Sequence, residues 1–142
     1  MLRVVAVAFF ALLVAAAPAS AAKPADGVFT APKGAVELGY DLQFKVDRGG
    51  TRISGLVAHV LERCSGSSTT SVTTVGPGLT WKVRNGRFAG RRKERAGGIT
   101  LYTTFEGRFT SATTVTGIIR QESIVAGATC DTYALKFKAR RG

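Results

Sequence analysis

The densest group of chemically specific side chains in this sequence is a basic stretch between residues 81 and 100. It holds seven of the chain's 20 lysine and arginine residues, together with its only tryptophan and its only asparagine. Arginine binds carboxylate and phosphate groups through paired hydrogen bonds, so an arginine-rich surface suits a ligand with repeated negative charges. The candidate anion-binding residues are Lys82, Arg84, Arg87, Arg91, Arg92, Lys93 and Arg95.

The dipeptide Asn85-Gly86 at the centre of this stretch predicts a two-residue β-hairpin turn, because both residues adopt positive φ readily. In such a hairpin Arg84 and Arg87 face each other across the two strands. Like charges placed directly opposite are unfavourable, so an anionic ligand would explain them. The alternative is that these are solvated charges that protect strand edges from pairing. The apolar residues of the hairpin lie on its other face: Trp81, Val83 and Phe88.

Nucleic acid is a weaker candidate ligand than other polyanions. Tyr102 is the only aromatic residue near the basic stretch that shares its exposed face, so stacking on single-stranded bases is poorly supported. Positive charge alone binds polyanions without sequence preference and loses affinity as salt rises. We therefore expect no sequence-specific nucleic-acid recognition.

Catalytic chemistry finds little support. His59 is the only histidine, and on a strand it would share a face with Val57 and Leu61, which favours a packed or half-buried side chain over a general base. No Gly-x-Ser-x-Gly motif accompanies it. The possible partners for a Ser-His-Asp arrangement are Ser54 or Ser123 with Asp41 or Asp131.

The carboxylates are also poorly placed for catalysis. Glu62, Glu106 and Glu122 lie on predicted strands, without a spacing that would set two of them across one glycosidic bond. Asp131 is better explained as a turn-forming residue. We expect a protein that is not an enzyme and that uses no cofactor and no metal.

Two cysteines, Cys64 and Cys130, are too few for a structural zinc site beside a single histidine. In an oxidising compartment an even pair predicts one disulfide. Closing so long a loop contributes about 4 kcal/mol, mainly by restricting the unfolded chain.

The first 21 residues predict export. Arg3 precedes an uncharged apolar run from Val4 to Ala17, and Ala19-Ser20-Ala21 has the small residues that signal peptidase requires. We expect cleavage after Ala21, or else after Ala22. The alternative of an uncleaved anchor is weaker, because the run is shorter than the roughly 20 residues of a spanning helix. Without Arg3 the net charge of the chain falls from +11 to +10, which favours anionic partners outside the cell.

Most of the remaining chain alternates between apolar and polar residues with a period of two, which predicts antiparallel strands with one buried face. The clearest strands are residues 40–47, 99–109 and 133–140, and less regular ones are residues 52–64, 69–75 and 115–124. About eight strands predict a single antiparallel β-sandwich, with a closed β-barrel as the alternative. We expect a leader and edge strand at residues 22–38 and the sandwich domain at residues 39–142.

Several short motifs recur in a known group of proteins. They are the hairpin, the strand with Phe105, Gly107 and Phe109, the stretch Gly117 to Arg120, Cys130-Asp131-Thr132, and the closing Phe137, Ala139 and Arg141. Together they resemble a loose group of small exported bacterial β-sandwich proteins of unknown function, over nearly the whole mature chain. The resemblance implies the fold and export, and no catalytic residue. Such proteins often have glycine where this chain has Tyr133.

The function that these features favour is non-catalytic. We expect an exported binding or accessory module for anionic extracellular or cell-wall polymers, such as acidic polysaccharide or extracellular DNA, with the basic hairpin as its site. The alternative is a protein-binding module, for instance an inhibitor of a secreted enzyme. A hydrolase ranks third.

Overall fold

The computed structural model describes residues 20–66, 70–74 and 78–142. In this part of the chain, eleven antiparallel strands form one continuous hydrogen-bonded sheet, with a single turn of 3₁₀ helix, η1 (Glu37–Gly39). The strands are β1 (Gly27–Ala31), β2 (Asp41–Asp47), β3 (Arg52–Cys64), β4 (Thr70–Thr74), β5 (Trp81–Lys82), β6 (Arg87–Phe88), β7 (Arg91–Ala96), β8 (Ile99–Ser111), β9 (Thr114–Val125), β10 (Ala128–Asp131) and β11 (Leu135–Arg141). The predicted all-β fold is confirmed.

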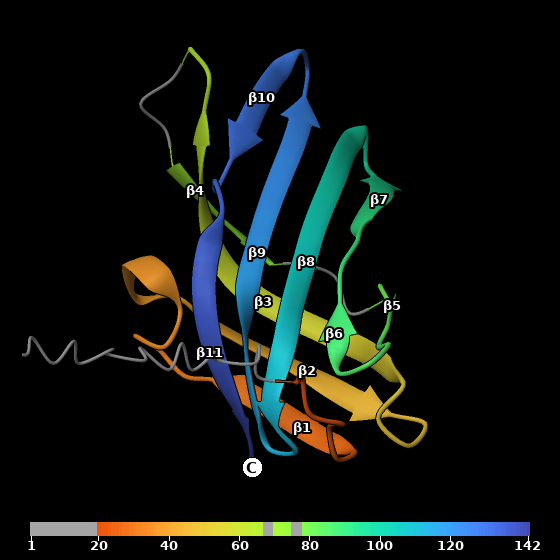
Figure 1. Cartoon of the computed structure of the whole chain (residues 1–142). Coiled ribbons are helices and arrows are strands. Elements are labelled where there is room, and N and C mark those ends of the chain that lie inside the picture. Colours follow the sequence, from red (N-terminus) through yellow and green to blue (C-terminus); the bar gives the residue numbers. More distant parts are fainter. Residues whose placement is uncertain (1–19, 67–69, 75–77) are drawn as a thin grey trace, which may run out of the picture.

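The sheet folds over on itself into two layers (Figure 1). One, the β3 layer, contains β1, β2 and β3 with β4 and β5 paired to β3, and the other, the β8 layer, contains β11, β9 and β8 with β6 and β7 paired to β8. Figure 1 shows the long strands of the β8 layer crossing in front of those of the β3 layer. This two-layer arrangement is the sandwich-like fold that the alternation predicted. The count exceeds the expected eight because it includes short pieces such as β5, β6 and β10.

Three connections join the layers. On one side β1 pairs with both β2 and β11, and on the other the β5–β6 hairpin pairs with β3 through β5 and with β8 through β6. At one end β10 pairs with both β3 and β9. The hairpin that carries the basic residues is therefore also a structural bridge between the layers.

The prediction of an edge strand within residues 22–38 is wrong. β1 has hydrogen-bonded neighbours on both sides, so it lies inside the sheet. Its alternation is that of an ordinary strand, with Phe29 and Ala31 fully buried. The short length and the flanking proline and glycine residues suggested an edge, but only the two-layer topology decides which strands have one neighbour. The apolar run from Val4 to Ala17 lies outside the described residues.

The core between the layers is largely aromatic. Phe105 from β8 contacts Phe88 and Trp81 from the hairpin, with ring centroids 4.9 and 5.3 Å apart. The rings that form this cluster are Phe29, Phe44, Trp81, Phe88, Phe105, Phe109 and Phe137. Aromatic burial of this kind supplies much of the free energy of folding in a small domain.

Two glycines make room for this cluster. Gly107 and Gly117 are cross-strand partners in the middle of the long strands β8 and β9. A Cβ atom at Gly107 would lie 2.7 Å from the Phe88 ring, and one at Gly117 would lie 2.9 Å from the Phe137 ring. The missing side chains therefore let the aromatic rings pack directly under the strands.

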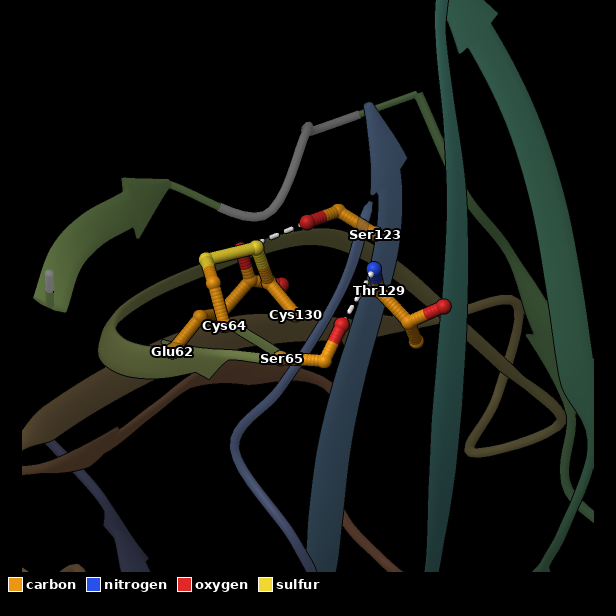
Figure 2. Close-up of a disulfide and its surroundings, with 6 residues drawn as sticks. All are labelled: Glu62, Cys64, Ser65, Ser123, Thr129 and Cys130. Carbon is orange, nitrogen blue, oxygen red and sulfur yellow. Dashed lines mark hydrogen bonds between the residues drawn. A yellow bond between two sulfur atoms is a disulfide. The ribbon is translucent and has the colours of Figure 1, made fainter. Parts of the chain in front are cut away.

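The end of the sandwich near β10 is more polar (Figure 2). Cys64 of β3 and Cys130 of β10 are opposite each other and form the predicted disulfide, at a sequence separation of 66 residues. Beside it, the Ser123 hydroxyl donates a hydrogen bond of 2.8 Å to the Glu62 carboxylate. The residues with buried polar side chains in the described part are Glu62, Thr103, Gln121, Ser123 and Thr132.

Across the described ranges, none of the helical segments has the length and apolar character needed to cross a membrane.

Candidate anion-binding groove

The hairpin has the predicted geometry. Asn85 and Gly86 have φ angles of 50° and 68°, and two backbone hydrogen bonds of 2.8 and 2.9 Å join Arg84 and Arg87 as direct partners. The burial pattern follows the expected two faces. Trp81, Val83 and Phe88 are buried, and Lys82, Arg84 and Arg87 are exposed. The Trp81 indole N–H donates to the Gly90 carbonyl at 3.0 Å, so its polar atom is satisfied inside the core.

The sheet extends this pair of arginines into a longer series. Arg87 is the cross-strand partner of Arg108 on β8, which faces Thr116 on β9, which faces Lys138 on β11. We call Arg84, Arg87 and Arg108 the arginine row. Neighbouring strands lie about 4.8 Å apart, so the four steps from Arg84 to Lys138 span roughly 19 Å. None of the ion pairs within the described residues includes a member of the row.

An open groove of about 720 Å³ lies along the arginine row. Its cationic lining comes from Lys82, Arg84, Arg87, Arg92 and Arg108, and the remainder from Phe88, Ala89, Glu106, Gly107, Thr116, Gly117 and Ile118. Pairs of guanidinium groups in such a groove can bind a carboxylate or phosphate through several hydrogen bonds at once.

Of the four cations on β7, Arg92 lines this groove and the other three do not. Arg91 forms an ion pair with Glu122 at 3.0 Å, and its guanidinium lies 4.0 Å from the centre of the Tyr102 ring. Lys93 contacts the same ring at 5.5 Å. Arg95 lines a separate depression at the Gly97–Gly98 turn. The structure thus brings four of the seven predicted residues together and separates the other three.

Arg108 is the candidate site residue that the sequence did not predict. The alternation placed it on the polar face of the strand at residues 99–109, but it did not predict which residues of other strands lie beside it. The pairing of β6 with β8 puts it beside Arg87, twenty-one positions earlier in the chain. No local signal in the sequence specifies that register.

A contrasting group of charges, which we call the salt-bridge chain, lies at the β10 end of the same layer. Arg91 binds Glu122, Arg120 contacts Glu122 at 3.4 Å, and Arg120 forms two hydrogen bonds with Asp131. Burial of the Asp131 carboxyl opposes its ionisation, but hydrogen bonds from Arg120 and the Tyr133 amide outweigh burial and hold the pKa of Asp131 below its usual value. Every charged residue of the salt-bridge chain therefore has a partner of opposite charge.

His59 lies on the outer face of the β3 layer, away from the groove. It shares that face with Val57 and Leu61, as the alternation predicted, and its side chain is 53% exposed, so it is about half-buried and is not packed in the core. Its Nδ1 atom lies 2.6 Å from the Asp41 carboxylate. Strand parity sets which face a residue occupies, but it does not say whether another layer covers that face.

Neither predicted serine completes a catalytic triad with this pair. The Ser54 hydroxyl donates to Asp47, and the Ser123 hydroxyl donates to the buried Glu62. Within the described residues no three side chains of His, Cys, Asp or Glu are grouped closely enough to hold a metal ion.

Another depression, of about 460 Å³, lies beside η1 and the turn before β11. Two of its lining residues, Leu38 and Tyr133, are 71% and 62% exposed and have φ angles of 64° and 58°. Tyr133 is the position where glycine would be favoured, because a positive φ strains other residues. Asp131 accepts a hydrogen bond of 2.7 Å from the Tyr133 N–H, and the Thr132 hydroxyl donates to the Tyr133 carbonyl at 2.8 Å. The predicted turn-forming role of Asp131 is confirmed.

The fold and the groove together define a two-layer antiparallel β protein with a cationic groove on one layer. No protein-family model matches the chain, and comparisons with curated proteins and with solved structures gave no significant match.

Proposed function

We propose that the protein is a non-catalytic binding module for anionic polymers outside the cytoplasm, and that the groove along the arginine row is its site. The observation that carries this proposal is the row itself. Arg84, Arg87 and Arg108 are neighbours across adjacent strands, and none of them has an acidic partner within the described residues. Like charges in this arrangement destabilise the free protein, and an anionic ligand would remove that repulsion.

The surrounding structure supports the same proposal. Carboxylates elsewhere on the protein form ion pairs with Arg91 and Arg120, whereas no member of the row forms an ion pair within the described residues. Export fits the disulfide, which persists in oxidising compartments, and fits the signal peptide proposed for residues 1–21. The ligands that this proposal covers are acidic polysaccharides, anionic cell-wall polymers and extracellular DNA.

The test compares two double variants with equal changes in net charge. R84E/R87E reverses two members of the row, and K33E/K45E reverses two exposed lysines outside the groove, on the β1–η1 connection and on β2. Binding of purified protein to polygalacturonate, polyphosphate and duplex DNA would be measured between low and high salt. We expect R84E/R87E to lose binding, and K33E/K45E to retain most of it.

On duplex DNA the salt dependence gives a second measure. Each phosphate contact adds about 0.9 to the slope of log K against log salt, so losing two contacts should lower that slope by roughly two. Equal loss of binding in both double variants would reduce the row to generic positive charge and would refute the site. Absence of binding to every polymer at low salt would refute the proposed function.

A protein-binding role is the second candidate, and the exposed Leu38 and Tyr133 are the observation that favours it. Large apolar side chains held at positive φ are unusual at a surface without a role, because they carry strain and lose contact with the core. Binding through this depression would survive high salt. It would be weakened by L38S/Y133S and not by R84E/R87E.

A further inference from the structure

Glu106 is the only acidic residue that lines the groove, where it lies among five cationic side chains. Its side chain is exposed on β8, two positions before Arg108. No ion pair within the described residues includes it, although cations surround it on the groove lining. A carboxylate in a site for anions needs a chemical reason, because it lowers the positive potential that the site depends on.

A carboxylate can only accept hydrogen bonds. A chain of phosphate groups offers it no donor and is repelled by its charge. A sugar polymer offers hydroxyl donors along with its acidic groups, so the same carboxylate becomes a favourable contact. Glu106 is therefore placed to distinguish an acidic polysaccharide from a polyphosphate.

The apolar part of the groove points to the same ligand class. Ile118 is the cross-strand partner of Glu106 and is half-buried on an outward-facing position of β9. The exposed Ala89 adds further apolar surface. Ligand sites commonly combine apolar surface with a few well-placed polar groups. The C–H faces of sugar rings can lie on such a surface, whereas a fully hydrated chain of phosphates gains nothing from it.

We propose that the ligand of this groove is a carboxylated sugar polymer. Arg84, Arg87 and Arg108 bind its carboxylates, Glu106 accepts hydrogen bonds from its hydroxyl groups, and the surface around Ile118 contacts its rings. This inference rests on the proposed function and narrows it to one chemical class, with Glu106 as a specificity-determining residue.

The experiment measures binding of the full-length mature protein to polygalacturonate and to linear polyphosphate, matched for the number of charges. The variants are E106A, which removes charge and acceptor, and E106Q, which removes the charge and keeps an acceptor. We expect wild type to prefer polygalacturonate, and E106A to bind it about tenfold more weakly, since a hydrogen bond to a charged group is lost. We expect E106A and E106Q to bind polyphosphate more tightly than wild type, and E106Q to keep more polygalacturonate binding than E106A.

The outcomes separate this inference from the proposed function. If E106A binds both polymers more tightly, Glu106 only repels anions and the inference is overturned, while the proposed function stands. If wild type prefers polyphosphate, the inference is overturned in the same way. If R84E/R87E binds both polymers as well as wild type, the groove is not the site and both proposals fail. The thermal midpoint of each variant checks that it is folded. We expect the midpoints of the Glu106 variants to stay close to that of wild type, because Glu106 is exposed and contributes little packing.

Discussion

The two ends of the β8 layer use the same kind of residue in opposite ways. In the salt-bridge chain, Arg91 and Arg120 alternate with Glu122 and Asp131, so each guanidinium has a carboxylate within reach. In the arginine row, the arginines are direct cross-strand partners of one another. Arginines paired with carboxylates contribute to the stability of the fold, whereas arginines that face one another repel and do not.

The interior beneath the two ends differs as well. Under the arginine row the layers meet through aromatic rings, with Phe88 and Trp81 both packed on Phe105. Near the salt-bridge chain the layers are joined by the disulfide and by buried polar contacts, such as the 2.8 Å hydrogen bond from Ser123 of β9 to Glu62 of β3. Packing holds the hairpin end without help from its charges, so those charges are available to a ligand.

The largest expected effect comes from removing the disulfide. The double variant C64A/C130A should lose about 4 kcal/mol in free energy of unfolding. The disulfide links residues at a separation of 66, so its removal greatly increases the conformational entropy of the unfolded chain. Urea denaturation checks this value. Polyanion binding below the unfolding transition should stay within twofold of wild type, because the groove is at the other end. A large loss of binding in the folded variant would show that the two ends are coupled.

The salt-bridge chain should make stability depend on pH. The pKa of Asp131 is lowered in the folded state, and that of Asp47 is lowered mainly by the hydrogen bond from Arg52. A carboxyl group with a depressed folded-state pKa stabilises the protein above its unfolded pKa of about 4, and this contribution is lost as the pH falls through the folded value. We therefore expect the free energy of unfolding to decrease from pH 5 to pH 2.

The variant D131N isolates the contribution of the salt-bridge chain to the pH dependence of stability. It should be less stable than wild type at pH 7 and should show a smaller decrease at acid pH, as measured by denaturation at each pH. D26N changes a carboxylate that hydrogen-bonds only the turn at Gly49 and Gly50, and it serves as the matched control. Parallel pH profiles for D131N and wild type would show that Asp131 contributes nothing through its ionisation.

The smallest effect is expected in the arginine row. R84Q removes one of two facing like charges from an exposed position, so the free energy of unfolding should change by no more than about 0.5 kcal/mol, and any change should be stabilising. R120Q, in the salt-bridge chain, should be more destabilising because it leaves Asp131 without its guanidinium partner. A comparison of thermal midpoints in the two single variants tests this contrast, and equal destabilisation would contradict it.

The local features of this protein were determined by its sequence. The type of turn at Asn85-Gly86 follows from the two residues that tolerate positive φ, and the buried positions of β8 follow from alternation with a period of two. The disulfide followed from the number of cysteines, because with two there is only one possible pair. Each of these depends on neighbouring residues or on simple counting.

The site depended on contacts between distant strands, and only the tertiary structure decided them. Register between strands that are far apart along the chain is set by how two layers share one core, here with Gly107 and Gly117 making room for the rings below. That register placed Arg108 beside Arg87 and paired Arg91 with Glu122 instead of leaving it in the groove. A basic stretch in the sequence shows that charge is present, but the fold decides which charges have partners and which are free to bind.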